Sequence, residues 1–143
     1  MSALAVTPVL VPLVTVVATS LTQHQPRLQQ ALSYGGVLLF LGCALALVGG
    51  AAVDQPAQAV FGGWGVPFGI EFLVDRTGAA LVLITALMGA ASLLFLASDA
   101  DPGPRHPLLL PLIHGVLAGV GGSFATADLF NLYVWFEVML ICS

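Results

Sequence analysis

Four stretches without Asp, Glu, Lys or Arg dominate this sequence, and each is about as long as a helix that crosses a bilayer. They cover residues 3–21, 31–53, 77–98 and 108–127. A transmembrane helix needs about 20 apolar residues to span the hydrocarbon core. Charged residues make up 7% of the 143 residues, whereas soluble domains carry about 25%. The sequence therefore predicts an all-α fold, a polytopic membrane helix bundle.

A fifth apolar stretch begins at Leu129 and continues to the last residue, Ser143. We therefore expect about four complete transmembrane helices plus a partial fifth, in a single membrane domain over residues 1–143. The expected helices cover residues 3–21, 31–53, 74–98, 108–127 and 129–143, with a long loop over 54–73. Membrane lipid is an expected partner of such a chain.

The long loop has a composition of its own. Residues 60–70 combine turn residues with β-branched and aromatic ones, which favours a short β-like hairpin lying against the membrane interface. Trp64 and Phe68 would then lie at the level of the lipid headgroups. An irregular glycine-rich connector is the alternative for this segment.

The few positive residues suggest an orientation. His24 and Arg27 lie between the first two helices, and Arg105 and His106 lie between the third and fourth. The loop over 54–73 contains no lysine or arginine. Because positive residues favour the cytoplasmic side, the distribution predicts that the N-terminus and the long loop face outward.

Small residues recur at every fourth position on two of the expected helices. They are Gly115, Gly119 and Ser123 on the fourth helix, and Gly42, Ala46 and Gly50 on the second. Such stripes let helix backbones approach closely in a membrane, where lipid supplies no hydrophobic drive for association. The pattern predicts close helix packing and does not indicate a function.

Glu137 is the only charged residue in the apolar and aromatic run over 129–141. In a helix that starts near Asp128 it lies about 13 Å in, close to the middle of the ~30 Å hydrocarbon core. A carboxylate there costs at least a few kcal/mol, so it indicates a proton or cation site. The alternative is a carboxyl that hydrogen-bonds a neighbouring helix. Tyr133, one turn earlier, either orients the carboxylate or serves as packing or an interface anchor.

Four further polar residues each allow two interpretations. Asp128 precedes the fifth helix and is either its N-cap or an outer entrance for a cation. Asp75 and Arg76 start the third helix, either as an N-terminal acid with a snorkelling arginine or as an ion pair to another helix or subunit. His114 lies inside the fourth helix, as a proton relay or as a hydrogen-bonding packing residue.

Several site classes find no support in the sequence. Cys43 and Cys142 both fall inside expected helices and lack metal-ligand spacing, so we expect neither a disulfide nor a metal site. The sequence has no basic run that would bind nucleic acid.

Several stretches carry a resemblance that covers essentially the whole chain. They are residues 62–64 (Gly-Gly-Trp) with 67–70, residues 74–79, residues 121–132, and residues 135–140 (Trp-Phe-Glu-Val-Met-Leu). Together they resemble the antiporter-like subunits of Mrp-type multisubunit cation/proton antiporters and of respiratory complex I. The D subunits of the Mrp antiporters are the most similar, and the stretch over 128–140 is the most specific part.

The resemblance implies an all-helical subunit with two inverted repeats, each containing a discontinuous helix, as in other transporters. It also implies that a glutamate on the fifth helix pairs with a lysine on the seventh, and that protonation of this pair couples to ion movement. Glu137 matches that glutamate. The sequence ends at Ser143, before the lysine and both discontinuous helices, so we expect the N-terminal part of the family fold, which would not transport alone.

By this resemblance the chain is expected to be part of a cation/proton antiporter subunit in a bacterial plasma membrane. It would be a secondary transporter component, not an enzyme, with no cofactor, and would contribute Glu137 to the exchange of Na⁺ for H⁺. Its partners would be the other subunits of a hetero-oligomeric complex, including a chain with the missing helices. The alternatives are a proton-pumping subunit of complex I or of a membrane-bound hydrogenase, and an assembly module that transports nothing.

Overall fold

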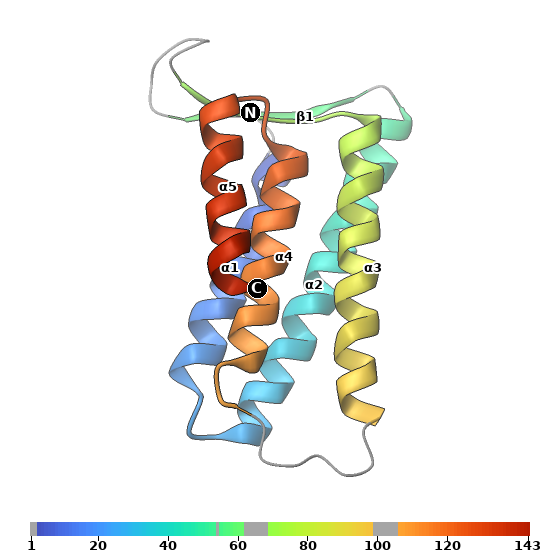
Figure 1. Cartoon of the computed structure of the whole chain (residues 1–143). Coiled ribbons are helices and arrows are strands. Elements are labelled where there is room, and N and C mark those ends of the chain that lie inside the picture. Colours follow the sequence, from blue (N-terminus) through green and yellow to red (C-terminus); the bar gives the residue numbers. More distant parts are fainter. Residues whose placement is uncertain (1–2, 54, 62–68, 99–105) are drawn as a thin grey trace.

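The computed structural model describes residues 3–53, 55–61, 69–98 and 106–143. Within these ranges the chain forms a helix bundle that carries a small hairpin at one end (Figure 1). The elements are a 3₁₀ helix η1 (Ala3–Val6), α1 (Thr7–Leu21), α2 (Pro26–Ala52), β1 (Ala57–Phe61), β2 (Ile70–Val74), α3 (Arg76–Ser98), α4 (Leu109–Ala125) and α5 (Leu129–Cys142). The predicted fold class, an all-α membrane bundle with a short hairpin, is confirmed.

The helices run alternately up and down, so that consecutive helices are antiparallel (Figure 1). α4 lies between α1, α3 and α5, and α2 contacts both α1 and α3. Three apolar helical spans are long enough to cross a membrane: Ala3–Leu21, Pro26–Ala52 and Arg76–Ser98. α4 and α5 are shorter, with 17 and 14 residues. α5 ends part-way along the bundle (Figure 1).

Two helix starts differ from the expected bounds. α2 begins at Pro26 instead of residue 31, since proline suits the first helical turn, where its missing N–H is not needed. The side-chain amide of Gln29 donates to the carbonyls of Thr19 (2.9 Å) and Pro107 (2.8 Å), which ties the start of α2 to the last turn of α1 and to the residues that precede α4. α3 begins at Arg76 instead of residue 74, because Val74 belongs to β2.

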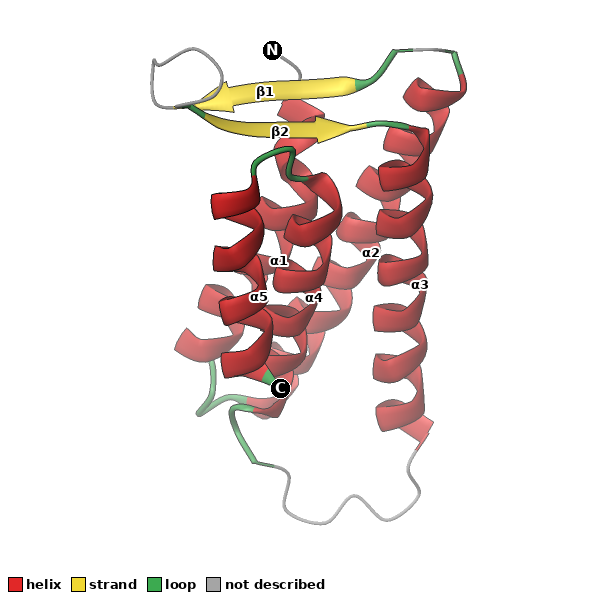
Figure 2. Ribbon diagram, turned by 45° about the horizontal axis from the view of Figure 1, so that its top comes forward, coloured by secondary structure: helices red, strands yellow, loops and turns green. Residues whose placement is uncertain are grey.

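The hairpin crosses the end of the bundle at which the N-terminus lies (Figure 2). Its antiparallel register runs from Ala57 opposite Val74 to Phe61 opposite Ile70. The strands thus flank the glycine-rich segment and begin and end further out than predicted. The two strands cover residues 57–61 and 70–74. Over these residues the alternative of an irregular connector is wrong. Trp64 and Phe68, predicted at headgroup level, lie outside the described residues, as does Arg105.

Glycines set how closely the helices approach, but only one of the two predicted stripes behaves as expected. On α4, Gly115 and Gly119 lie directly against α5, and Gly122 continues this face in place of Ser123. On α2, a side chain at Gly42 would meet nothing within 4 Å. The predicted packing of the α2 stripe is therefore absent at Gly42 among the described residues. Close approach by α2 occurs instead at Gly36, which touches Thr15 of α1.

The contact between Gly36 and Thr15 can be tested. Gly36→Ala should lower the free energy of unfolding by about 1–3 kcal/mol, because the added Cβ would overlap the Thr15 side chain. Gly35→Ala is the matched control, since its Cβ would enter open space and helical Gly→Ala changes gain about 0.5–1 kcal/mol. Thermal unfolding of the purified chain in detergent, followed by circular dichroism, measures both. Equal midpoints would show that the two helices do not meet at Gly36.

Candidate functional site

α5 carries Glu137, and glycines of α4 hold this helix in place. A Cβ at Gly122 would overlap the ring of Trp135, and one at Gly119 would come within 2.9 Å of Met139. A Cβ at Gly115 would likewise overlap the sulfur of Cys142. Only glycine at these positions lets the two backbones come so close. The side of α5 that bears Trp135, Met139 and Cys142 is therefore fixed against α4.

This packing determines where Glu137 points. Glu137 lies two residues from both Trp135 and Met139, and two residues turn a helix by about 200°. Its side chain therefore leaves α5 on the side away from α4. The same side carries large exposed apolar residues: Leu129, Phe130, Phe136, Leu140 and Ile141. Glu137 itself is half-buried. The carboxylate thus lies on an apolar face that no other helix in the described residues covers.

Tyr133 is the residue that the structure brings to Glu137. It precedes Glu137 by one turn on the same face of α5, and 61% of the tyrosine is exposed. An orienting role for Tyr133 stays a prediction, beside packing or anchoring at the interface. The chain contains no lysine, and its described arginines, Arg27 and Arg76, lie in the first turns of α2 and α3. The described helices therefore bring no lysine or arginine to Glu137.

Asp128 is the N-cap of α5, as its position predicts. Its carboxylate accepts hydrogen bonds from the backbone N–H groups of Phe130 (3.0 Å) and Asn131 (3.4 Å). The side-chain amide of the buried Asn131 donates to Thr126 Oγ1 at 2.9 Å. This network closes the turn between α4 and α5, ahead of the helix that carries Glu137. A role for Asp128 as a cation entrance stays a prediction.

The hairpin also holds the turn between α4 and α5. The Ala127 N–H donates to the Glu71 carbonyl at 3.0 Å, and Phe72 forms a β-bridge with Thr126. The Phe72 ring is buried and lies 6.4 Å from the Trp135 ring, centroid to centroid. Residues far apart in sequence are thereby joined at the start of α5. No pattern in the sequence points to Phe72, Thr126 or Trp135 individually, although the glycine spacing on α4 predicts a close partner helix.

Asp75 and Arg76 form the start of α3 at the hairpin end. The Gly78 N–H donates to Asp75 Oδ1 at 2.7 Å, so Asp75 is the predicted N-terminal acid. Arg76 Nε donates to the Ala51 carbonyl at 3.1 Å, near the C-terminal end of α2, where a positive charge suits the helix dipole. Arg76 thus reaches another helix, through a backbone carbonyl. Neither residue lies on the face of α5 that carries Glu137.

His114 is fully buried and belongs to a different part of the bundle. Its ring nitrogen Nε2 and the Ser33 hydroxyl form a hydrogen bond of 2.9 Å between α4 and α2. The predicted role of a hydrogen-bonding packing residue is confirmed, and a relay role stays a prediction. The neighbouring Gly115 faces α5, whereas His114 faces α2. The structure therefore does not bring His114 together with Glu137.

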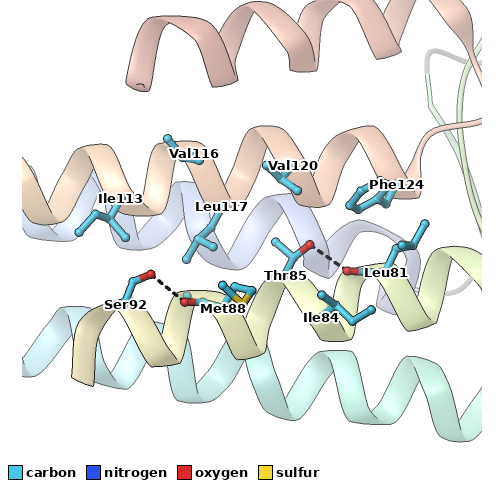
Figure 3. A pocket seen from close by; sticks show the side chains of 11 residues that line it. Leu81, Ile84, Thr85, Met88, Ser92, Ile113, Val116, Leu117, Val120 and Phe124 are labelled. Atoms are coloured by element: carbon cyan, nitrogen blue, oxygen red, sulfur yellow. Dashed lines mark hydrogen bonds between the residues drawn. The ribbon is translucent and has the colours of Figure 1, made fainter. Parts of the chain in front are cut away.

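A groove between two of the helices offers nothing to an ion. It has a volume of about 470 Å³, lies between α3 and α4, and is lined almost wholly by apolar side chains (Figure 3). The hydroxyls of Thr85 and Ser92 each donate at 2.8 Å to a carbonyl of their own helix, Leu81 and Met88 respectively. Across the described ranges, no group of three or more His, Cys, Asp or Glu side chains could hold a metal ion.

Comparison with known proteins identifies relatives of the whole chain, although no protein-family model matches it. The antiporter protein mnhD2 of Staphylococcus haemolyticus (strain JCSC1435) is 32% identical over 142 residues, covering 99% of this chain and 28% of the relative. The D subunit of the Na(+)/H(+) antiporter of Alkalihalophilus pseudofirmus is 32% identical over 147 residues, covering 100% and 29%. The chain thus spans a little over a quarter of the length of these curated relatives.

Two solved structures share the fold. A chain of the Mrp complex from Dietzia sp. DQ12-45-1b is 28% identical and superposes with a TM-score of 0.81, covering 99% of this chain and 27% of that chain. A chain of the membrane-bound sulfane sulfur reductase, an archaeal respiratory membrane complex, is 25% identical with a TM-score of 0.85, covering 96% and 28%. Both neighbours are parts of larger membrane complexes.

The N-cap predicts how Asp128 substitutions behave. Asp128→Ala should destabilise the start of α5 by about 0.5–2 kcal/mol, because two backbone N–H groups lose their acceptor. Asp128→Asn keeps a capping oxygen and should stay near the original stability. Hydrogen exchange of the Phe130 and Asn131 amides measures both. If the alanine variant exchanges no faster than the asparagine variant, the carboxylate does not hold this turn.

Proposed function

We propose that this chain, a homologue of the D subunits of Mrp-type Na⁺/H⁺ antiporters, forms part of a cation/proton antiporter in a bacterial plasma membrane. Antiporter subunits match it over its whole length, and three of its helical spans are long and apolar enough to cross a membrane. In this proposal the chain is a transport component within a larger complex.

The position of Glu137 carries the proposal. It is the only acid within the apolar helices, and the packing of Trp135 and Met139 on α4 turns it outward. A structural carboxyl would be expected to bond a neighbouring helix of the same bundle. Glu137 instead faces away from α4, whose glycines hold Trp135 and Met139 on the other side of α5. This arrangement suits a group that takes up and releases a cation.

Charge balance suggests how Glu137 works. An ionised carboxylate in the hydrocarbon core costs several kcal/mol unless a cation compensates it. A proton, a Na⁺ ion or a basic side chain each supplies that compensation, so that the arrival of one favours the departure of another. Competition of this kind couples proton uptake to cation release. The Tyr133 hydroxyl would hold the carboxyl in one rotamer while the exchange takes place.

The proposed partners follow from the length of the relatives. This chain spans 28% and 29% of two of them, so most of the residues of a complete subunit lie beyond those described. We place the cationic partner of Glu137 in that remainder, on a helix that covers the outward face of α5. Other subunits of the complex, membrane lipid, H⁺ and Na⁺ complete the set of partners.

The orientation is part of the proposal. His24 and Arg27 lie at the end of the bundle opposite the hairpin, whereas Glu71, Asp75 and Asp128 lie at the hairpin end. With positive residues favouring the cytoplasm, the N-terminus and the hairpin face outward. Arg76, at the hairpin end, runs against this pattern, and its bond to the Ala51 carbonyl gives it a local role there.

A proton-pumping subunit of a redox complex is the second candidate, favoured by the likeness to the archaeal respiratory complex at a TM-score of 0.85. Intact-mass spectrometry of the complex, purified in mild detergent from its native membrane, distinguishes the two. Cluster-bearing redox subunits beside this chain would favour the pump, and other small antiporter subunits would favour antiport. The absence of any chain with the remaining helices would favour an assembly module that transports nothing.

The proposal predicts that Glu137→Gln abolishes Na⁺-dependent proton exchange while leaving the amount of assembled complex unchanged, because the amide has no negative charge and cannot take up and release a proton. Everted membrane vesicles with a pH-sensitive dye measure the exchange.

The matched control is Glu71→Gln, the same change on the hairpin, where the carboxylate accepts a hydrogen bond of 2.6 Å from Gln58. This variant should retain exchange, since the backbone carbonyl of Glu71, not its side chain, holds Ala127. Normal exchange in the Glu137 variant would contradict the proposed role. Loss of the complex from the membrane would instead assign Glu137 a structural role.

A further inference from the structure

We infer that Trp135 is a positioning residue for Glu137: wedged between Gly122 of α4 and Phe72 of the hairpin, it fixes the rotation of α5 and hence the direction of the carboxylate. The inference rests on the proposed function for its consequences in transport, but its geometry stands without it. Trp135 lies two residues before Glu137, on nearly the opposite side of the helix.

The first observation is where the indole ring of Trp135 packs. A Cβ at Gly122 would overlap ring carbons of Trp135, so the ring lies directly against the α4 backbone. Met139 sits in the same way on Gly119, one turn further along α5. Two contacts separated by one turn fix the rotation of a helix, whereas one contact would let it roll. Glu137, between them in sequence, is held facing away from α4.

The second observation is the hairpin above the indole. The Phe72 ring lies 6.4 Å from the Trp135 ring and is itself 5% exposed. Its backbone pairs with Thr126, and the neighbouring Glu71 carbonyl accepts from the Ala127 N–H. The hairpin therefore holds both the turn before α5 and the indole that sets the direction of Glu137. A shift of β2 would be passed to α5 both through the backbone of the preceding turn and through this aromatic contact.

The third observation is chemical. The indole nitrogen Nε1 of Trp135 is buried, with no hydrogen-bond partner in the part of the chain that the structure describes. A buried donor without a partner is unfavourable, and each such case in a native structure asks for an explanation. Here the size and flat shape of the ring, which fill the space between Gly122 and Phe72, supply one. Phenylalanine would retain a ring there without the buried donor.

The test compares Trp135→Ala with Trp135→Phe in the complete complex, purified from its native membrane. Infrared difference spectra on changing pH report the C=O stretching band of the protonated Glu137 carboxyl, assigned as the band that Glu137→Gln removes. Trp135→Ala should shift this band and the pH profile of exchange, and reduce exchange about tenfold or more, since displacement of a reacting group by ~1 Å can cost up to a hundredfold. Trp135→Phe should restore all three readouts.

The control is Phe95→Ala, an aromatic truncation on α3 at a side chain that is 78% exposed, and it should change none of the readouts. An unshifted band and pH profile in assembled Trp135→Ala complex would overturn the inference. If that variant fails to assemble, Phe72→Leu takes its place, and an unshifted band there has the same meaning. Should Glu137→Gln leave exchange intact, the proposed function falls, yet the band still decides the role of Trp135.

Discussion

The close approach of α4 and α5 is the constraint on which the rest of this structure depends. A bilayer gives two apolar helices no hydrophobic reason to associate, so contact area has to supply the attraction. Glycines at 115, 119 and 122 create that area because α4 has no side chains of its own where α5 packs against it. One face of α5 therefore packs against α4, and Glu137, the one acid of this helix, lies on the opposite face. The position of the acid follows from packing, with no charge involved.

The hairpin adds a second constraint. Helix contacts fix how α5 is rotated, and the hairpin fixes where it starts, through Thr126 and Ala127. Asp128 then satisfies the first free N–H groups of the helix. An element of two short strands thus acts as a brace across the bundle, joining the ends of α3 and α4, which are far apart in sequence (Figure 2).

Charge and composition predicted the fold well, because the length of an apolar stretch along the sequence decides whether a helix can cross a membrane. The caps at Asp75 and Asp128 were equally predictable, since a cap depends on local sequence. The rotation of each helix was not. The stripe on α2 looked like that on α4, yet Gly42 meets nothing, because a stripe matters only where a neighbour arrives. The outward direction of Glu137 and the packing of Trp135 likewise depend on which helix lies beside them, which the sequence of one helix does not contain.

The groove between α3 and α4 has a consequence for electrical insulation. A water molecule in a cavity needs two to four polar partners to remain there, and here the hydroxyls of Thr85 and Ser92 are already engaged with their own helices. A chain of water molecules therefore finds no free polar side chain to hold it along this groove. Protons and ions would therefore find no conducting path along this groove between α3 and α4.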